Sequence, residues 1–155
     1  MMTLAPIPND HGRRTAPSAG ARRVKWRFGS KQASEIWDQP VDGPLGDIEA
    51  AERIRSICRS AADSAEQAAH PAGNGKRSAQ KKHKMERERY ERGARAAMEI
   101  AMTMSDELMR DAAVREIVDL CLAADNTRTA KILFRAIQAP AIRDLVLRDH
   151  PGLEK

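Results

Sequence analysis

The sequence predicts a mainly α-helical protein, a small bundle of about four to five helices that follows a long, largely disordered basic N-terminal arm. Three observations lead to this prediction. Apolar residues recur at helical spacings from Asp47 onward, prolines and glycines concentrate before it, and aromatic residues make up only 3% of the 155 residues. A core must therefore be built from Ala, Leu, Ile, Val and Met.

The arm is predicted to cover residues 1–46. This stretch holds five of the eight prolines and five of the nine glycines. Its few apolar residues cannot offset the entropy cost of ordering the chain. Two short segments are exceptions: an alternating run at 23–28, and residues 30–38, which favour a short helix with Ser30 as its N-cap.

The first long helix is predicted over residues 47–69, with Asp47 as its N-cap. Its apolar residues recur three and four positions apart, which is one stripe of a 3.6-residue period. This stripe consists of Ile48, Ala51, Ile54, Cys58, Ala61, Ala65 and Ala68. Because most of these residues are small, we expect the helix to pack closely against another. The sequence HPAGNG at 70–75 ends it and opens a linker over residues 70–77.

The remaining helices are predicted to form a domain over residues 78–150. A second helix covers 78–103, and a third covers 106–124 after the capping sequence SDEL. A fourth follows the sequence DNT at 125–127, and Pro140 precedes a short fifth. The buried face of the third helix is expected to contain Leu108, Met109, Ala112, Ile117, Cys121 and Leu122. The apolar residues of this domain fall within about 65 residues, between Met85 and Leu147, so its stability as a lone domain is expected to be marginal. A homodimer or docking of the first helix is expected to extend its core.

Composition excludes a membrane protein and a secreted disulfide scaffold. No apolar run approaches the roughly 18 residues that cross a bilayer, and no N-terminal apolar stretch typical of a secretory signal is present. We therefore expect no membrane insertion and a cytoplasmic location. Cys58 and Cys121 lie on predicted apolar faces, where free thiols behave as small buried hydrophobic groups.

Positive charge is concentrated in two blocks. Residues 1–31 hold seven Arg and Lys against a single acid, and residues 76–95 hold nine against three Glu. The denser cluster is KRSAQKKHK at 76–84, which contains no acid. Lys and Arg at a helix N-terminus oppose the macrodipole at roughly 0.3–1 kcal/mol each. Because folding alone does not favour that arrangement, the cluster is expected to bind an anionic partner such as nucleic acid.

The stretch RRVKWRFGSK at 22–31 permits three interpretations. In the first interpretation the stretch is a strand, with Val24, Trp26 and Phe28 on one face and Arg23, Lys25 and Arg27 on the other. A symmetric dimer would pair two such strands as a ribbon that lies in the major groove of DNA. The helices beneath would then be 30–38 and 47–69. Alternatively, the strand adds to a sheet edge of another protein. In the third interpretation it is a flexible basic arm whose aromatic rings stack on exposed bases.

Residues 115–137 superficially match a helix-turn-helix. Two predicted helices meet at a tight polar turn, and Arg128, Lys131 and Arg135 fall on one side of the second. The turn lacks glycine, and Glu116 and Asp119 on the first helix would face phosphates. Ordinary helix packing is therefore the favoured interpretation.

Catalytic signals are weak. The four histidines lie in predicted loops or in the basic run, without the spacing of metal ligands. Glycine-rich phosphate loops, nucleophile elbows and HExxH sequences are not found. We therefore expect no enzymatic activity, no metal and no cofactor.

Taken together, the sequence predicts a non-enzymatic helical protein that binds nucleic acid, DNA more than RNA, or another polyanion, in an accessory or regulatory role. The alternative is a helical protein–protein interaction module or adaptor with solvated basic tails. In the first case phosphates are neutralised by two clusters, with base stacking by Trp26 as a secondary contact. The predicted site residues are Arg22, Arg23, Lys25, Trp26, Arg27, Lys76, Arg77, Lys81, Lys82 and Lys84.

Overall fold

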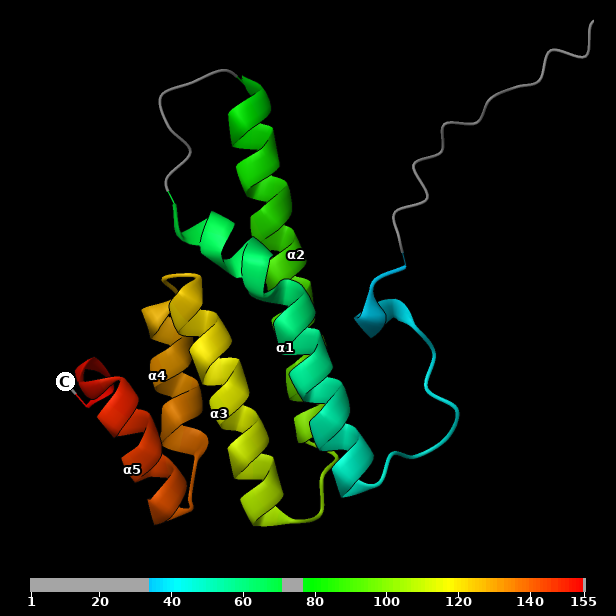
Figure 1. Cartoon of the computed structure of the whole chain (residues 1–155), viewed down its shortest axis with the longest axis vertical. Helices are drawn as coiled ribbons and strands as arrows, with labels where there is room; N and C mark the ends of the chain where they lie inside the picture. Colours follow the sequence, from blue (N-terminus) through cyan, green and yellow to red (C-terminus); the bar gives the residue numbers. More distant parts are fainter. Residues whose placement is uncertain (1–33, 71–76, 155) are drawn as a thin grey trace, which may run out of the picture. The chain divides into compact units, whose positions relative to one another are not determined.

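The protein is mainly α-helical, as predicted, and the described part of the chain contains no strand (Figure 1). A computed structural model describes residues 34–70 and 77–154. Its five α-helices are α1 (Asp47–Ala69), α2 (Arg77–Ala101), α3 (Glu107–Ala123), α4 (Thr127–Ala136) and α5 (Pro140–Asp149). Two short 3-10 helices, η1 (Ile36–Asp38) and η2 (Pro151–Leu153), precede and follow them. Residues 1–33 of the disordered arm predicted over 1–46 lie outside the described residues.

The helices pack mainly on their neighbours in the sequence. α1 and α2 form an antiparallel pair, and both also contact α3 (Figure 1). α4 and α5 pack on α3, and η2 closes against α4 and α5. One continuous apolar core therefore runs from α1 through α3 to the C-terminal segment.

The buried face of α1 differs from the predicted stripe at its start. Ile54 and Ala61 are fully buried as expected, but Ile48 is 64% exposed and Ala51 only partly buried. A separation of six residues puts Ile48 about 120° around the helix from Ile54. Because α1 packs against both α2 and α3, its buried face instead includes Ala50.

The predicted face of α3 is also partly wrong. Ile117 and Cys121 are buried, whereas Leu108 and Ala112 are exposed. α3 lies against α1 and α2 on one side and α4 and α5 on the other, so its buried surface is wider and differently centred than a single stripe. The buried α3 residues are Asp111, Ala113, Val114, Ile117, Val118, Leu120 and Cys121.

Short polar side chains cap α3 and α4. The Asp106 carboxylate accepts a hydrogen bond from the Met109 amide, and the Asn126 side chain accepts one from the Thr129 amide. Asp125, in the turn between these helices, has a φ of 57°, a left-handed conformation that Asp tolerates better than most residues. A three-residue connection thus joins α3 to α4 without glycine.

Asp47 has a different role from the predicted N-cap. Gly46 occupies the N-cap position of α1, and Asp47 is the first helical residue. Its carboxylate accepts hydrogen bonds from the amides of Ser105 and Asp106, at 2.8 and 2.9 Å. Asp47 therefore ties the start of α1 to the loop between α2 and α3.

Residues 34–46, predicted as part of the disordered arm, contact α1 and α2 instead; we call them the strap. Of the short helix expected over 30–38, residues 30–33 and the predicted N-cap Ser30 lie outside the described residues. The described part contains the 3-10 turn η1, with Glu35 as its N-cap. The Trp37 ring packs over Gly93, where an added Cβ would lie 3.3 Å from its Cζ3 atom. The Arg53 guanidinium donates hydrogen bonds to backbone carbonyls of the strap, those of Ile36 and Gln39, at 2.8 and 2.7 Å. Apolar contact by Trp37 and the hydrogen bonds from Arg53 thus order this segment despite its two prolines and two glycines.

Candidate nucleic-acid interface

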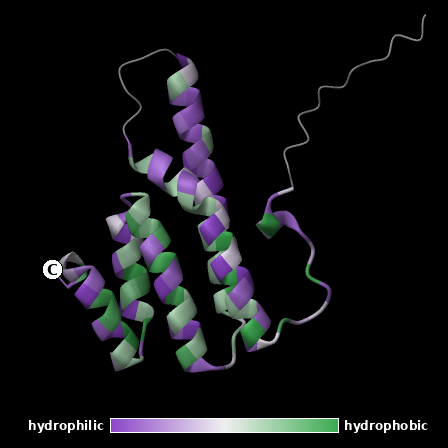
Figure 2. Ribbon diagram, viewed as in Figure 1, coloured by the Kyte–Doolittle hydropathy of each residue, from purple (hydrophilic) through white to green (hydrophobic). Residues whose placement is uncertain are grey.

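The N-terminal end of α2 projects into solvent. Every residue from Arg77 to Lys82 is exposed. His83 is half-buried, and its Nε2 atom lies 3.1 Å from the carbonyl oxygen of Ala68 on α1. Figure 2 shows this half of α2 as mostly hydrophilic. We call residues 77–85 the α2 tip.

The cations of the α2 tip lie mainly on one face. Arg77, Lys81 and Lys84 follow spacings of four and three residues, which place them on the same side of a helix. The buried residue Tyr90 lies about 120–140° around the helix from Arg77 and Lys84, so this face points away from the core. Lys82 projects from the flank.

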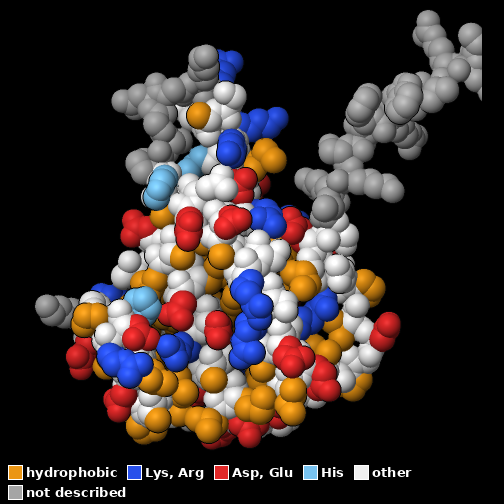
Figure 3. All heavy atoms as spheres, viewed as in Figure 1, with side chains coloured by type: hydrophobic (Ala, Val, Ile, Leu, Met, Phe, Trp, Pro, Cys, Tyr) orange, Lys and Arg blue, Asp and Glu red, His pale blue; other side chains and the backbone are white. Residues whose placement is uncertain are grey.

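The positive charge of the α2 tip is almost unopposed. Lys84 lies 3.7 Å from a Glu88 carboxylate oxygen, and both side chains are exposed. Arg77, Lys81 and Lys82 form no ion pair with any residue that the structure describes. On the face shown in Figure 3, several Lys and Arg side chains lie at this end of α2. The helix macrodipole adds partial positive charge at the same end.

Only part of the predicted interface can be placed. Arg77, Lys81, Lys82 and Lys84 are brought together on the α2 tip. The remaining predicted residues lie outside the described ranges, so the strand, ribbon and flexible-arm interpretations of 22–31 stay predictions. Those residues are Arg22, Arg23, Lys25, Trp26, Arg27 and Lys76.

A polar network that sequence reasoning missed joins the strap to α1 and α2. Arg89 binds Glu35 through two hydrogen bonds of 2.6 and 3.0 Å, and donates a third to the hydroxyl of Ser64, a fully buried residue. The Ser64 hydroxyl donates in turn to Glu86 at 2.7 Å. The Arg89 hydrogen bond lowers the pKa of Glu35 below its usual value, and the same bond raises the pKa of Arg89. Glu35 and Arg89 are 54 residues apart, so no local pattern signals the pair.

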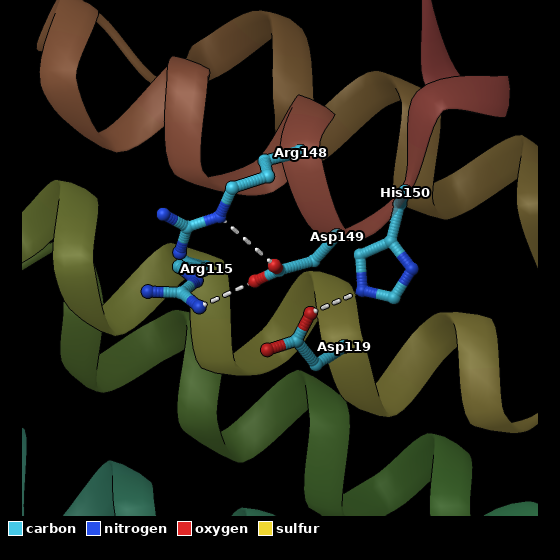
Figure 4. Close-up of polar contacts among 5 residues, drawn as sticks. All are labelled: Arg115, Asp119, Arg148, Asp149 and His150. Atoms are coloured by element: carbon cyan, nitrogen blue, oxygen red, sulfur yellow. Dashed lines mark hydrogen bonds and ion pairs between the residues drawn. The ribbon is translucent and has the colours of Figure 1, made fainter.

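A second unpredicted cluster fastens the C-terminal end of α5 to α3 (Figure 4). Asp119 lies 2.9 Å from the His150 ring nitrogen Nε2, and Arg115 lies 2.8 Å from Asp149. Arg148 is a more distant partner of Asp149, at 3.5 Å. All of these side chains are partly exposed, which is typical of surface contacts that hold a terminal helix in place.

The cysteines are free and buried, as predicted. Burial raises the pKa of the Cys58 thiol to about 12, and burial also raises the pKa of Cys121. Since the thiolate is the nucleophilic form, these thiols are poorly reactive near neutral pH. Within residues 34–70 and 77–154, no group of three or more His, Cys, Asp or Glu side chains is placed to hold a metal ion.

Comparisons with known proteins give no further guide. No protein-family model, curated protein or solved structure matches this chain. None of the described helices is both long enough and apolar enough to cross a membrane.

Proposed function

We propose that this protein binds nucleic acid, DNA more than RNA, or a similar polyanion, through the α2 tip. The proposal rests on one observation: Arg77, Lys81 and Lys84 lie on the outward face of α2, and the helix contains no acidic residue before Glu86. Exposed cations placed against the helix macrodipole do not help the helix form. A polyanion supplies the missing counter-charge.

The dimensions of the α2 tip suit a phosphate backbone. Residues Arg77 to Lys84 span about 10 Å along the helix axis. Duplex DNA carries one charge per about 1.7 Å of its axis, so four cations over this length can each meet a phosphate. Phosphate contacts carry no sequence information directly, so binding through the tip is expected to be independent of base sequence.

The role that follows is accessory or regulatory rather than enzymatic, and we place it in the cytoplasm. Dimerisation and the contribution of residues 22–31 belong to the same proposal. If Trp26 and the cations around it contact the nucleic acid, they add phosphate contacts and base stacking to those of the tip. Loss of the tip alone would then weaken binding without abolishing it.

The test is a salt titration of binding to a fluorescein-labelled DNA duplex, followed by anisotropy. Replacing the four described cations of the tip by Gln should lower the slope of log K against log salt by about 3–4, since each phosphate contact contributes about 0.9. The substitutions are Arg77→Gln, Lys81→Gln, Lys82→Gln and Lys84→Gln. The loss should be similar for duplexes of unrelated sequence.

A matched control removes the same charge elsewhere on the surface. Four exposed arginines on α1 and α4 serve: Arg55, Arg59, Arg128 and Arg135. Their replacement by Gln should leave most of the salt slope intact. An equal loss in both variants would show that net charge alone drives binding, and no binding at low salt would refute the proposal.

A further inference from the structure

The bundle end where α1 and α3 begin differs in chemistry from the α2 tip. It is formed by residues 38–52, which include the later part of the strap and the start of α1, and by residues 96–109, which run from the end of α2 into α3. Asp47 joins the two stretches through its hydrogen bonds to Ser105 and Asp106. We call these two stretches the acidic end.

The acidic end carries eight carboxylates and no Lys or Arg. They are Asp38, Asp42, Asp47, Glu49, Glu52, Glu99, Asp106 and Glu107. Three arginines border these stretches: Arg53, Arg95 and Arg110. Arg53 directs its guanidinium at the carbonyls of Ile36 and Gln39, and Arg110 lies 3.8 Å from Asp111. This end therefore repels the polyanion that the α2 tip attracts, and attracts a cationic partner.

The acidic end also carries most of the exposed large hydrophobic side chains of the described residues. Of the six exposed large hydrophobic side chains in the described residues, four lie here. They are Val41, Ile48, Met102 and Leu108, with exposed fractions of 40, 64, 69 and 58%. In Figure 3, hydrophobic and acidic side chains intermingle around this end. Exposed apolar side chains grouped among polar ones mark interaction surfaces.

A hollow of about 430 Å³ opens between the strap, α1 and α2, and Val41 is the one of these four side chains that lines it. Its apolar lining comes from Trp37, Val41, Leu45 and Ile100. Its charged lining is Glu99 and Arg53, and the Arg53 guanidinium donates to the carbonyls of Ile36 and Gln39. The indole N–H of Trp37 is buried and has no hydrogen-bond partner among the described residues. A hollow of this size accepts about one or two large apolar side chains.

We propose that the acidic end docks a basic amphipathic helix of a partner protein. The helix places an apolar side chain in the hollow, lays its apolar face over Met102 and the strap, and sets flanking Lys and Arg against the carboxylates. Amphipathic helices commonly bind grooves in this way, and opposite charge fixes their orientation. The protein is then an adaptor, with a polyanion on the α2 tip and a cationic partner at the other end.

The probe is a synthetic amphipathic peptide about 15 residues long, with Leu on one face and Lys on the other, labelled with fluorescein. It is titrated with the full chain at low salt. Binding should weaken as salt is added, and a peptide with Ala in place of Leu should bind about tenfold more weakly or not at all. A peptide with Glu in place of Lys should not bind.

Two variants locate the site. Glu99→Lys reverses an exposed charge at the hollow and should weaken peptide binding about two- to tenfold. Ala96→Phe fills the hollow from a partly exposed position of α2 and should weaken it about tenfold or more. The control Glu66→Lys makes the same charge change near the C-terminal end of α1 and should change affinity less than about twofold. Matching far-UV circular dichroism shows that each variant folds.

Three outcomes would overturn the inference. The Leu/Lys peptide could fail to bind, it could bind all variants equally, or the chain could form dimers that Ala96→Phe dissociates, which would make a second copy the occupant. The inference stands apart from the function proposed for the α2 tip, because Glu99→Lys should leave DNA binding intact. Loss of DNA binding with retained peptide binding would refute only the proposed function.

Discussion

Replacing Gly93 by Leu tests how the strap is held against α1 and α2. Gly93 lies in the middle of α2, and a Cβ atom added there would lie 3.1 Å from the Ala61 Cβ and 3.3 Å from Trp37 Cζ3. Both distances are shorter than ordinary contacts between carbon atoms. Ala61 is fully buried in α1 and Trp37 belongs to the strap, so a leucine side chain at this position must displace the indole or separate the helices.

The expected change is the balance of two opposed effects. A glycine in a helix interior costs about 1 kcal/mol relative to a good helix former, so propensity alone predicts that Gly93→Leu stabilises the protein by nearly that amount. Overpacking costs about 1–3 kcal/mol, and loss of the buried contacts of Trp37 adds about 1.5–3 kcal/mol. We therefore expect a net destabilisation of about 2–4 kcal/mol.

Urea unfolding measures this change, and tryptophan fluorescence reports the strap when Trp26, the other tryptophan of the chain, is replaced by Phe in every protein compared. Gly93→Leu should lower the free energy of unfolding and shift the emission to longer wavelength as Trp37 becomes exposed. The control Ala112→Leu, at an exposed position of α3, should stay within about 0.5 kcal/mol of the wild type. If Gly93→Leu is as stable as the wild type with unchanged emission, Trp37 does not pack on α2 as described.

Three further predictions concern buried and paired groups. Asp111 is 1% exposed, and its carboxylate accepts hydrogen bonds from the backbone amides of Gln138 and Ala139 at 2.8 and 2.7 Å. Asp111→Ala should therefore lower the free energy of unfolding, measured in urea, by about 2–5 kcal/mol. A change below about 1 kcal/mol would show that the loop before α5 does not need the carboxylate. Burial raises the pKa of both cysteine thiols. A disulfide reagent at pH 8 should therefore react with the native chain far more slowly than with the unfolded chain. Equal rates would contradict the buried positions of the two thiols. Hydrogen bonding by Arg89 lowers the pKa of Glu35 below 4.5. The wild type should therefore have a higher free energy of unfolding than Glu35→Gln above about pH 5, and this difference should shrink as the pH falls through the lowered pKa. A difference that grows at low pH would contradict this prediction.

Helix positions were predictable because capping residues, prolines and apolar periods act locally. The second helix was predicted over 78–103 and spans Arg77–Ala101, and Pro140 begins α5 as its fixed φ favours. The faces were less predictable. A single-stripe pattern put Leu108 in the core, although α3 packs on two sides and exposes it.

The strap and the acidic end depend on contacts between residues far apart in the sequence. Nothing near Trp37 shows that Gly93 accommodates its ring, and nothing near Asp47 shows that its carboxylate binds the loop before α3. The cations of the α2 tip were found from sequence because they cluster within nine residues of one helix. The acidic end joins two stretches about 45 residues apart in the chain, and only folding brings them together.

The most direct test of the account is an NMR titration of the isotope-labelled full chain with a short DNA duplex at low salt. We predict that amide signals of the α2 tip, residues 77–85, shift on addition of DNA and return as salt is added. Signals from the acidic end, residues 38–52 and 96–109, should not shift. Shifts concentrated at the acidic end, or an α2 tip unaffected by DNA, would contradict the assignment of the tip as the polyanion-binding surface.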